Sequence, residues 1–541
     1  MPELLHPGVY VQEVASGVRP VQGVSTSTAA FVGVADKGPR PGSILPNGTM
    51  AKAVLVTSMT DYMRRFGGFR RDSYLTYTAR AFFENGGSRL YVVRIVGTVS
   101  GPPSSPPVAP AAAALSPGGS ALALSAANEG VWGNSISVQI VNSSDGDARN
   151  FKLIVLYAGN PVESFDSLTF QNSPTTLPGA TSPGVYGRTS VNGRSEYIAI
   201  TAEFTTRPVN STIALTGGND GPPVQPSDFI GAAAADNTRT GTGLHALDKV
   251  TDVNLIALPG RGDSATVNAG MEYCKNRQLQ DCFFIGDMGT VTSVDAARIP
   301  GAVTTVRTIA DAQTFATAGS PPLDKAAGDY GAVYFPWIWS GDPIGVGLNP
   351  KILLPPSGFL AGIYARIDNS RGVFKAPAGI EAGVSGALAT PADVSDAEQD
   401  QLNPVSVNVI RTVPGSGFVV WGTRTIGSDA SWRYIPVRRM AIFLRTSIYY
   451  GIQWAVFEPN DEPLWASLRL NIRSFMLTQF RAGAFQGSKP DDAFFVMCDK
   501  STTTQQDIDN GVVNILVGFA PLKPAEFVVL KLSQKVNQPA V

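Results

Sequence analysis

The stretch from Arg424 to Leu532 constrains the fold most, because two long amphipathic helices are predicted within it. The first should begin near Pro436, since proline is accepted in a first helical turn. Its apolar residues recur at helical spacing: Val437, Ala441, Leu444, Ile448, Ile452 and Ala455. The second should begin near Pro463, where acidic residues favour a helix start. Its apolar stripe comprises Leu464, Leu468, Ile472, Phe475, Met476 and Phe480.

The length and charge of the chain limit its function class. A chain of 541 residues predicts about three domains. The 42 basic and 43 acidic residues give a net charge of −1, which argues against nucleic-acid binding driven by bulk charge. Charged residues make up only 16% of the chain, a share that suits a protein burying much of its surface in an assembly.

The sequence offers no catalytic, metal-binding or cofactor-binding residues that we would assign. His6 and His245 are the only histidines, and neither has a setting typical of a catalytic site. Nucleophile-elbow and phosphate-loop motifs do not occur. The segment LPGRGDSATVNAG is interpreted as a plain strand-to-helix connection. The three cysteines, Cys274, Cys282 and Cys498, are predicted to be buried thiols.

The ends of the chain are predicted to be extended arms. An isolated strand cannot satisfy its own backbone groups, so each arm needs the edge of another strand. The alternating residues of the N-terminal arm include Val9, Tyr10, Val11, Gln12 and Val14, and those of the C-terminal arm include Phe527, Val528, Val529, Leu530 and Leu532. The strand predicted to receive an arm contains Phe418, Val419, Val420 and Trp421.

Between the arms, the pattern alternates between two kinds of domain. Apolar runs at 90–96, 253–260, 282–288 and 331–339 predict buried strands of an α/β sheet, with helices at 75–83 and 357–367. Two Pro- and Gly-rich linkers bracket short alternating runs that predict an antiparallel β domain. Such a module, bracketed by linkers, is interpreted as a peripheral insertion into the α/β domain.

Several phrases resemble one protein family. They are PGVYVQEV with GVSTSTAAFVG near the start, the ordered residues of AGIYARIDNSRGVFKAPAG, and RTI, WRYIPVRRM, FEPND and PLW in the C-terminal part. In this order they resemble contractile tail sheath proteins of myophage tails and related injection systems. The matching segments are spread over about two-thirds of the chain, and we take the resemblance as our hypothesis. The β insertion at 97–243 resembles nothing that we can name.

The resemblance implies a function and a set of partners. Sheath subunits of this family stack as six-fold rings around an inner tube, with baseplate and terminator or cap proteins at the ends. Their arms pair with adjacent subunits, and the sheath contracts. The resemblance also implies a basic, tube-facing helix surface, for which the candidates are Arg438, Arg439, Arg469, Arg473 and Arg481. No cofactor, nucleic acid or membrane insertion is expected.

The fold class predicted is a multidomain α+β protein. We expect an N-terminal arm at 1–30 that completes the inner domain, a middle α/β domain at 31–96 and 244–371, an outer all-β insertion at 97–243, and an inner C-terminal α/β domain with its arm at 372–541. The expected protein assembles in the cytoplasm and becomes part of a phage tail or a phage-tail-like particle. An α/β enzyme, a surface adhesin and another self-assembling structural protein are the alternatives.

Overall fold

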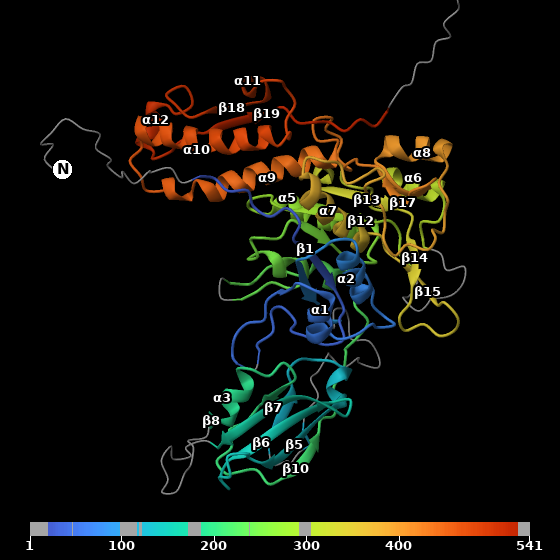
Figure 1. The fold of residues 1–541 in the computed structure, drawn as a ribbon, viewed down its shortest axis with the longest axis vertical. Helices are drawn as coiled ribbons and strands as arrows, with labels where there is room; N and C mark the ends of the chain where they lie inside the picture. Colours follow the sequence, from blue (N-terminus) through green and yellow to red (C-terminus); the bar gives the residue numbers. More distant parts are fainter. Residues whose placement is uncertain are drawn as a thin grey trace, which may run out of the picture. The chain divides into compact units, whose positions relative to one another are not determined.

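The computed structural model describes residues 20–45, 47–97, 116–117, 122–170, 185–236, 239–291 and 304–527. The chain divides into two compact units (Figure 1). The larger unit comprises Ser25–Ile442 and the chain from Pro524 onward, and the smaller comprises Phe443–Lys523 and the chain up to Val24. This division falls at Phe443, within a helix, so residue 372, where the C-terminal domain was predicted to begin, lies inside the larger unit.

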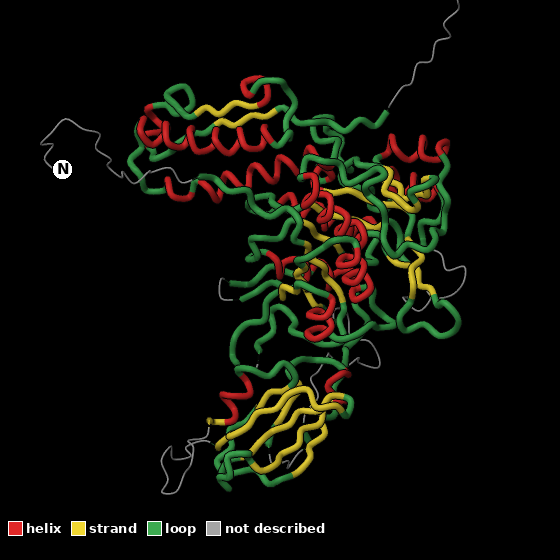
Figure 2. The backbone as a smooth tube through the Cα atoms, viewed as in Figure 1, coloured by secondary structure: helices red, strands yellow, loops and turns green. Residues whose placement is uncertain are grey.

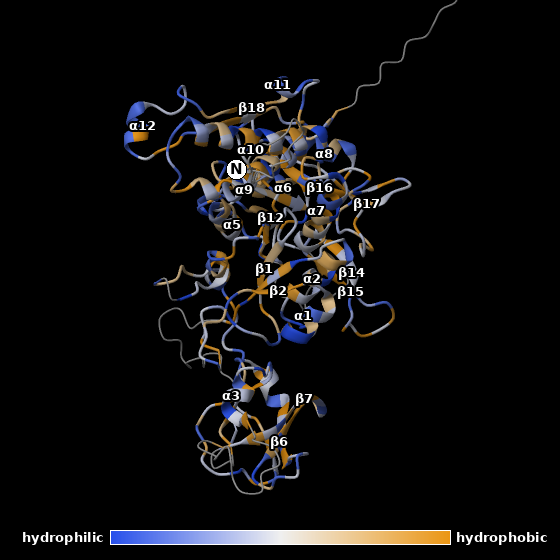
Figure 3. Cartoon of the chain, turned by 60° about the vertical axis from the view of Figure 1, so that its left-hand side comes forward, coloured by the Kyte–Doolittle hydropathy of each residue, from blue (hydrophilic) through white to orange (hydrophobic). Residues whose placement is uncertain are grey.

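An eight-stranded sheet forms the centre of the larger unit. Its inner pairs are parallel and its two outermost pairs are antiparallel. The order is β17 (Gly417–Trp421), β16 (Val407–Val413), β13 (Gly331–Phe335), β12 (Phe283–Asp287), β11 (Leu255–Ala257), β1 (Ala29–Gly33), β3 (Leu90–Arg94) and β2 (Val54–Val56). The strands predicted from the apolar runs are confirmed as β3, β11, β12 and β13, because burial on both faces requires near-continuous apolar sequence. Figure 3 shows this apolar character on β1 and β12.

Helices cover both faces of this sheet (Figure 2). The connections from β1 to β3 and from β11 to β12 run in opposite directions along the sheet, so right-handed crossovers place their helices on opposite faces. The first carries α1 (Met59–Phe66) and α2 (Leu75–Glu84), and α7 (Ser357–Arg371) packs beside α2. The second carries α5 (Ser264–Asn276), and α6 (Ile309–Ala318) and α8 (Asp396–Leu402) pack against each other. A hairpin of β14 (Ile338–Gly341) and β15 (Lys351–Leu354) follows β13.

The predicted β insertion has a core of its own. Its main sheet comprises β10 (Ser211–Ala214), β5 (Ile136–Asn142), β6 (Phe151–Tyr157), β7 (Asn160–Thr169) and β8 (Val185–Tyr186), and β4 (Leu124–Ala126) pairs with β9 (Ile198–Ile200) beside α3 (Gly187–Asn192). The apolar core of the insertion runs from Leu122 to Leu215. Phe229, on α4 (Pro226–Ile230), instead belongs to the core of the large sheet. The module is therefore narrower than residues 97–243.

The insertion is held to the sheet domain at the point where it leaves and returns. A side chain at Gly97 would overlap the Pro222 carbonyl, so the outgoing and returning chains touch. Buried Lys37 lies among aromatic rings of the insertion, 3.9 Å from the centroid of Tyr197, and burial lowers its pKa to about 8. Arg94 at the end of β3 donates to the carbonyl of Glu129 at 2.7 Å. These contacts bind two cationic side chains of the sheet domain to the insertion.

The smaller unit contains the two helices predicted from the C-terminal stretch, and both are confirmed. α9 (Ile435–Gly451) begins in the larger unit and continues into the smaller one, and α10 (Glu462–Arg481) begins behind Asp461, whose side chain caps the N–H of Leu464. Leu464, Trp465 and Leu468 pack with buried Cys498. The remaining elements are α11 (Pro490–Ala493), β18 (Phe494–Met497), α12 (Gln505–Asp509) and β19 (Leu516–Phe519).

Candidate assembly site

Two features of the structure bear on assembly: the free strand edges and the segments from which the arms leave the body. Of the predicted arm residues, Val9, Tyr10, Val11, Gln12, Val14, Val528, Val529, Leu530 and Leu532 lie outside the described residues. Phe527 is described, and it is exposed at the end of a segment without regular secondary structure. The site is therefore built from the roots of the arms, meaning Thr26 and Glu526 with the residues that bind them.

The root of the N-terminal arm is bound by a buried ion pair. Arg439 on α9 donates two hydrogen bonds to Asp368 on α7, at 2.9 and 2.5 Å, and their side chains are only 4% and 2% exposed. Thr26 joins both partners: its hydroxyl donates to Asp368 at 2.7 Å, and its carbonyl accepts from Arg439 at 3.0 Å. A buried pair persists only where further hydrogen bonds complete it, and Thr26 supplies them.

The root of the C-terminal arm is bound by a second pair of the same type. Arg424 donates to both carboxylate oxygens of Glu526, at 2.9 and 2.6 Å, and the Tyr434 hydroxyl donates to the same group at 3.3 Å. The hydrogen bond to Glu526 raises the pKa of Arg424. Two parallel charge-assisted bonds fix the direction of the carboxylate as well as its position.

The strand predicted to receive an arm already has backbone partners on both sides. β17 pairs with β16 on one side. On its other side, the N–H of Val384 donates to the Phe418 carbonyl at 2.9 Å. The Val420 N–H donates to the Ala382 carbonyl, and the Val420 carbonyl accepts from the Gly379 N–H. A single bridge also joins Val419 to Gly383. Phe418–Trp421 therefore offers no free edge, because the segment 379–384 occupies it within the same chain.

A two-stranded sheet in the smaller unit has the free edges that β17 lacks. β18 and β19 pair antiparallel with each other, and no other strand of the described chain pairs with either of them. One face packs inward through Phe494 and Val496, while Phe495 and Leu516 on the other face are about half exposed. Two strands of four residues are too few to be stable alone, and unpaired edges of this kind accept further strands.

The candidate tube-facing arginines fall into two groups. Arg438 and Arg439 are buried, so their assignment to an outer surface is corrected. The Arg438 guanidinium stacks 3.8 Å from the Tyr330 ring centroid, and Arg439 binds Asp368. On α10 the other three reach the surface: Arg469 pairs with Glu462, Arg473 pairs with Asp491, and Arg481 is exposed.

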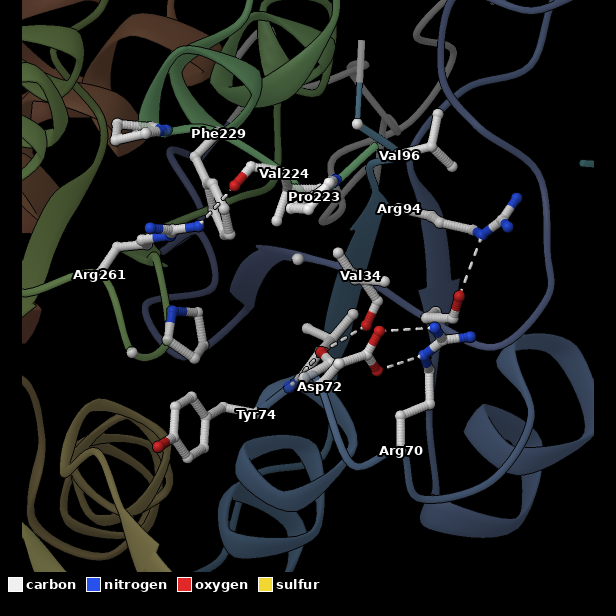
Figure 4. Close-up of a pocket in the computed structure, with 18 of the residues that line it drawn as sticks. Val34, Arg70, Asp72, Tyr74, Arg94, Val96, Pro223, Val224, Phe229 and Arg261 are labelled. Atoms are coloured by element: carbon white, nitrogen blue, oxygen red, sulfur yellow. Dashed lines mark hydrogen bonds and ion pairs between the residues drawn. The ribbon is translucent and has the colours of Figure 1, made fainter. Parts of the chain in front are cut away.

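A cavity of about 880 Å³ lies at the carboxyl ends of β1, β3 and β11 (Figure 4). Open α/β sheets often bind ligands at such a position. Here the charged groups are bound by the chain itself: Arg70 pairs with Asp72 and Asp220, Arg94 donates to main-chain carbonyls, and Arg261 donates to Val224. They form no convergent catalytic set. Among the described residues there is no cluster of acidic, Cys or His side chains fit to hold a metal, and no helix long and apolar enough to cross a membrane.

Two protein-family models match the chain. The central domain of phage tail sheath proteins matches residues 233–426, and the C-terminal domain of phage tail sheath proteins matches residues 427–535. Together they cover more than half of the sequence. The chain belongs to the phage tail sheath protein family. Because sheath proteins are structural proteins, this membership favours a structural protein over the enzyme alternative.

Individual sheath proteins match parts of the chain. The tail sheath protein of Vibrio phage KVP40 is 27% identical over 180 residues, which are 33% of this chain and 26% of the relative. The tail sheath protein of Enterobacteria phage T4 is 25% identical over 182 residues, again 33% of this chain and 26% of the relative. The matched part of the chain thus spans about a quarter of the length of these two relatives.

Solved sheath structures share the fold over nearly the whole chain. The helical sheath protein of the anti-feeding prophage in its contracted state has a TM-score of 0.55 at 22% identity, covering 98% of this chain and 99% of its own. A sheath tail protein from Listeria innocua has a TM-score of 0.56 at 12% identity, covering 93% and 96%. At such identities the likeness shows the fold alone. The resemblance expected from the sequence is confirmed as a family and as a fold.

Sequence reasoning missed the arm roots and the β18–β19 sheet. The partners Asp368 and Arg439, like Arg424 and Glu526, lie far apart in the chain, and isolated charges carry no spacing signal. The sheet did leave a signal, since FFVM at 494–497 and LVGF at 516–519 are short apolar runs that follow the second helix. Their shortness made them less prominent than the β17 run.

Proposed function

We propose that this sheath-family protein is the protomer of a contractile tail sheath, in a phage tail or a phage-tail-like injection particle. Copies would stack as six-fold rings around an inner tube, between a baseplate and a terminator or cap. Contraction of this lattice would drive the tube through a target envelope. The names and solved assemblies of the sheath relatives support this function, and no step of it calls for a nucleotide or metal in this chain.

The observation that carries the proposal is the open β18–β19 sheet. Strand addition would supply main-chain hydrogen bonds between copies while leaving other surfaces free to change partners. We therefore transfer the receiving role from β17 to β18 and β19, and propose the arms as the added strands. A chain that donates strands and accepts them elsewhere makes heterologous contacts, which generate rings and helical filaments.

We keep a tube-facing role for the arginines of α10. Arg473 and Arg481 are exposed on a helix that also exposes Leu470, whereas Arg469 is half-buried and also donates to the Cys498 carbonyl. Their partners Glu462 and Asp491 are themselves exposed, so these ion pairs are weak and an acidic partner surface could replace them. Arg438 and Arg439 are removed from this role.

Electron microscopy of the purified protein tests the proposal. We expect hollow tubes from the full-length chain, and monomers or short oligomers after deletion of residues 1–16 or of 528–541, with unchanged circular dichroism. The second deletion keeps Glu526 and thus the root of the arm. A full-length protein that stays monomeric at high concentration, or tubes of normal length from either truncation, would contradict the proposal.

A further inference from the structure

The two arm roots meet on one short stretch of the chain. Arg424, which binds Glu526, and Arg439, which binds Asp368 and Thr26, bound a stretch of the larger unit that we term the yoke, residues 424–439. Tyr434, within the yoke, also donates to Glu526. The yoke thus binds both Glu526, next to the C-terminal arm, and Thr26, at the start of the larger unit. Residues 20–24, between Thr26 and the N-terminal arm, are held farther along α9, where the Val24 N–H donates to the Ser447 hydroxyl at 3.1 Å.

The yoke is itself bound firmly to the large sheet. Asn408 on β16 is fully buried, and it donates to the Arg424 carbonyl and accepts from the Arg424 N–H, both at 2.8 Å. The N–H of Ile426 donates to Gly331, the first residue of β13, at 3.0 Å. At the other end Arg438 stacks on Tyr330 and on Trp432. The two ends of the yoke are thus fixed on the sheet domain, while residues 428–431 between them are exposed.

Glu526 differs from its neighbours in the tail. Ala525 and Phe527 are exposed, whereas the Glu526 side chain is 11% exposed and its partner Arg424 is 13% exposed. Within the part of the tail that the structure describes, the hydrogen bonds of Pro524–Phe527 all end on the Glu526 carboxylate. One carboxylate therefore sets the place and direction from which the chain departs.

We propose that the yoke positions both arms, with the Asp368–Arg439 and Arg424–Glu526 pairs as clamps at their roots. This inference rests on the proposed function, because it assigns the clamps to strand exchange between copies. An arm that leaves from a clamped root searches a smaller volume for its acceptor, and less entropy is lost when it pairs.

A spin label at position 527 tests the C-terminal clamp in the unassembled protomer. The label is placed by F527C, since the three native cysteines are buried. We expect E526Q and R424Q to make the label markedly more mobile and the charge-exchanged pair R424E/E526R to restore much of the immobilisation. The control E203Q breaks the Arg188–Glu203 pair of the insertion and should leave the label unchanged. A label equally mobile in wild type and E526Q would overturn the clamp, whether or not tubes form.

Sedimentation of the polymer tests the role in assembly. We expect E526Q to leave roughly five- to tenfold more protein unpolymerised, as expected for loss of a charge-assisted pair, while E203Q matches wild type. For the N-terminal root, Asp368 variants risk unfolding, so T26V removes only the hydroxyl and should act in the same direction. Wild-type polymerisation by both E526Q and T26V would overturn the inference. Absence of wild-type tubes would instead contradict the proposed function, and the label would still decide the clamp.

Discussion

Asp287, at the end of β12, is a fully buried carboxyl group held by three donors. It accepts from the N–H of Gly260 at 3.0 Å, and from the N–H and hydroxyl of Ser357 at 2.8 and 2.9 Å. Burial raises its pKa to about 7, while these hydrogen bonds act in the opposite direction. The group joins the loop after β11 to the start of α7, so its protonation bears on the packing of the large sheet.

The stability of the larger unit should fall as pH rises through the pKa of Asp287. The folded-state pKa of about 7 exceeds the unfolded value of 3.8, so the folded protein binds the extra proton between these values. That stabilisation is present at low pH and is lost as pH rises through about 7. Urea unfolding between pH 5 and 8 measures the effect, with other groups contributing their own slopes.

The variant D287N isolates this contribution. It should lose the part of the pH slope between about pH 5 and 8 that Asp287 supplies. It should also be less stable by about 1–3 kcal/mol, because an amide has one acceptor oxygen and its NH2 group must face either the Gly260 or the Ser357 N–H. The control D396N, an exposed acid on α8, should keep the wild-type slope. An unchanged slope in D287N would show that Asp287 is not the titrating group.

Residue-scale prediction from sequence failed where partners were distant. A charged residue on an amphipathic helix normally lies on the solvated side, and this reasoning assigned Arg438 and Arg439 to an outer surface. Arg438 packs on Tyr330 as well as on nearby Trp432, and Arg439 binds Asp368; Tyr330 and Asp368 are distant in sequence, and only the fold brings them near. Burial of the three cysteines, in contrast, was predicted, because free thiols behave as small apolar side chains.

At the scale of elements, the β18–β19 sheet combines a packed face with open edges. The Ala520 N–H donates to the Ala493 carbonyl at 2.8 Å, and the alternation of an antiparallel ladder then turns the N–H and carbonyl of Val517 toward the outer edge of β19. Val517 thus offers hydrogen bonds that β18 does not use.

The variant V517P should block strand addition at β19. Proline removes the outward N–H while leaving the ladder bonds of Leu516 and Gly518 to β18 in place. We expect loss of tubes with a melting temperature within a few degrees of wild type. The control V517T keeps the N–H and the β-branched shape, and it should polymerise. Normal tubes from V517P would mean that the outer edge of β19 receives no arm.

Element prediction succeeded for the long periodic helices and for four of the buried strands, but it missed β1, which is fully buried and was placed partly in the N-terminal arm. The two C-terminal helices and the strands β3, β11, β12 and β13 were predicted because their patterns run over many residues. The segment 379–384 could not be predicted as a partner of β17: it has no strand pattern and joins Val419 through a single bridge. The receiving strand was therefore predicted wrongly, because the sequence does not show which strand edges the chain itself covers.

At the scale of the whole molecule, the insertion is a module with its own core. Replacing residues 98–219 by a short Gly-Ser linker should leave a folded, tube-forming protein, because Gly97 and Pro222 already touch. Some stability should be lost, since Arg94 loses its bond to Glu129 and Lys37 loses its aromatic partners. Circular dichroism and electron microscopy check both expectations.

A longer deletion serves as the contrast. Removing residues 98–243 also removes Phe229, which is 5% exposed in the core of the large sheet, and this protein should be destabilised by several kcal/mol or fail to fold. Equal stability of the two deletion proteins would show that the returning segment adds nothing to the core. Failure of the shorter deletion to fold would assign the insertion a structural role.

The contact of Gly97 with Pro222 has a wider consequence. When the two ends of an inserted domain join the host at one point, the host requires only that the termini of the inserted domain lie close together. Foreign domains with adjacent termini could thus be grafted there, as a display position whose cargo is chosen independently of the assembly chemistry. Sequence differences among related particles would then concentrate in such inserted domains. The strand-exchanging parts would vary less, because they must continue to pair with one another.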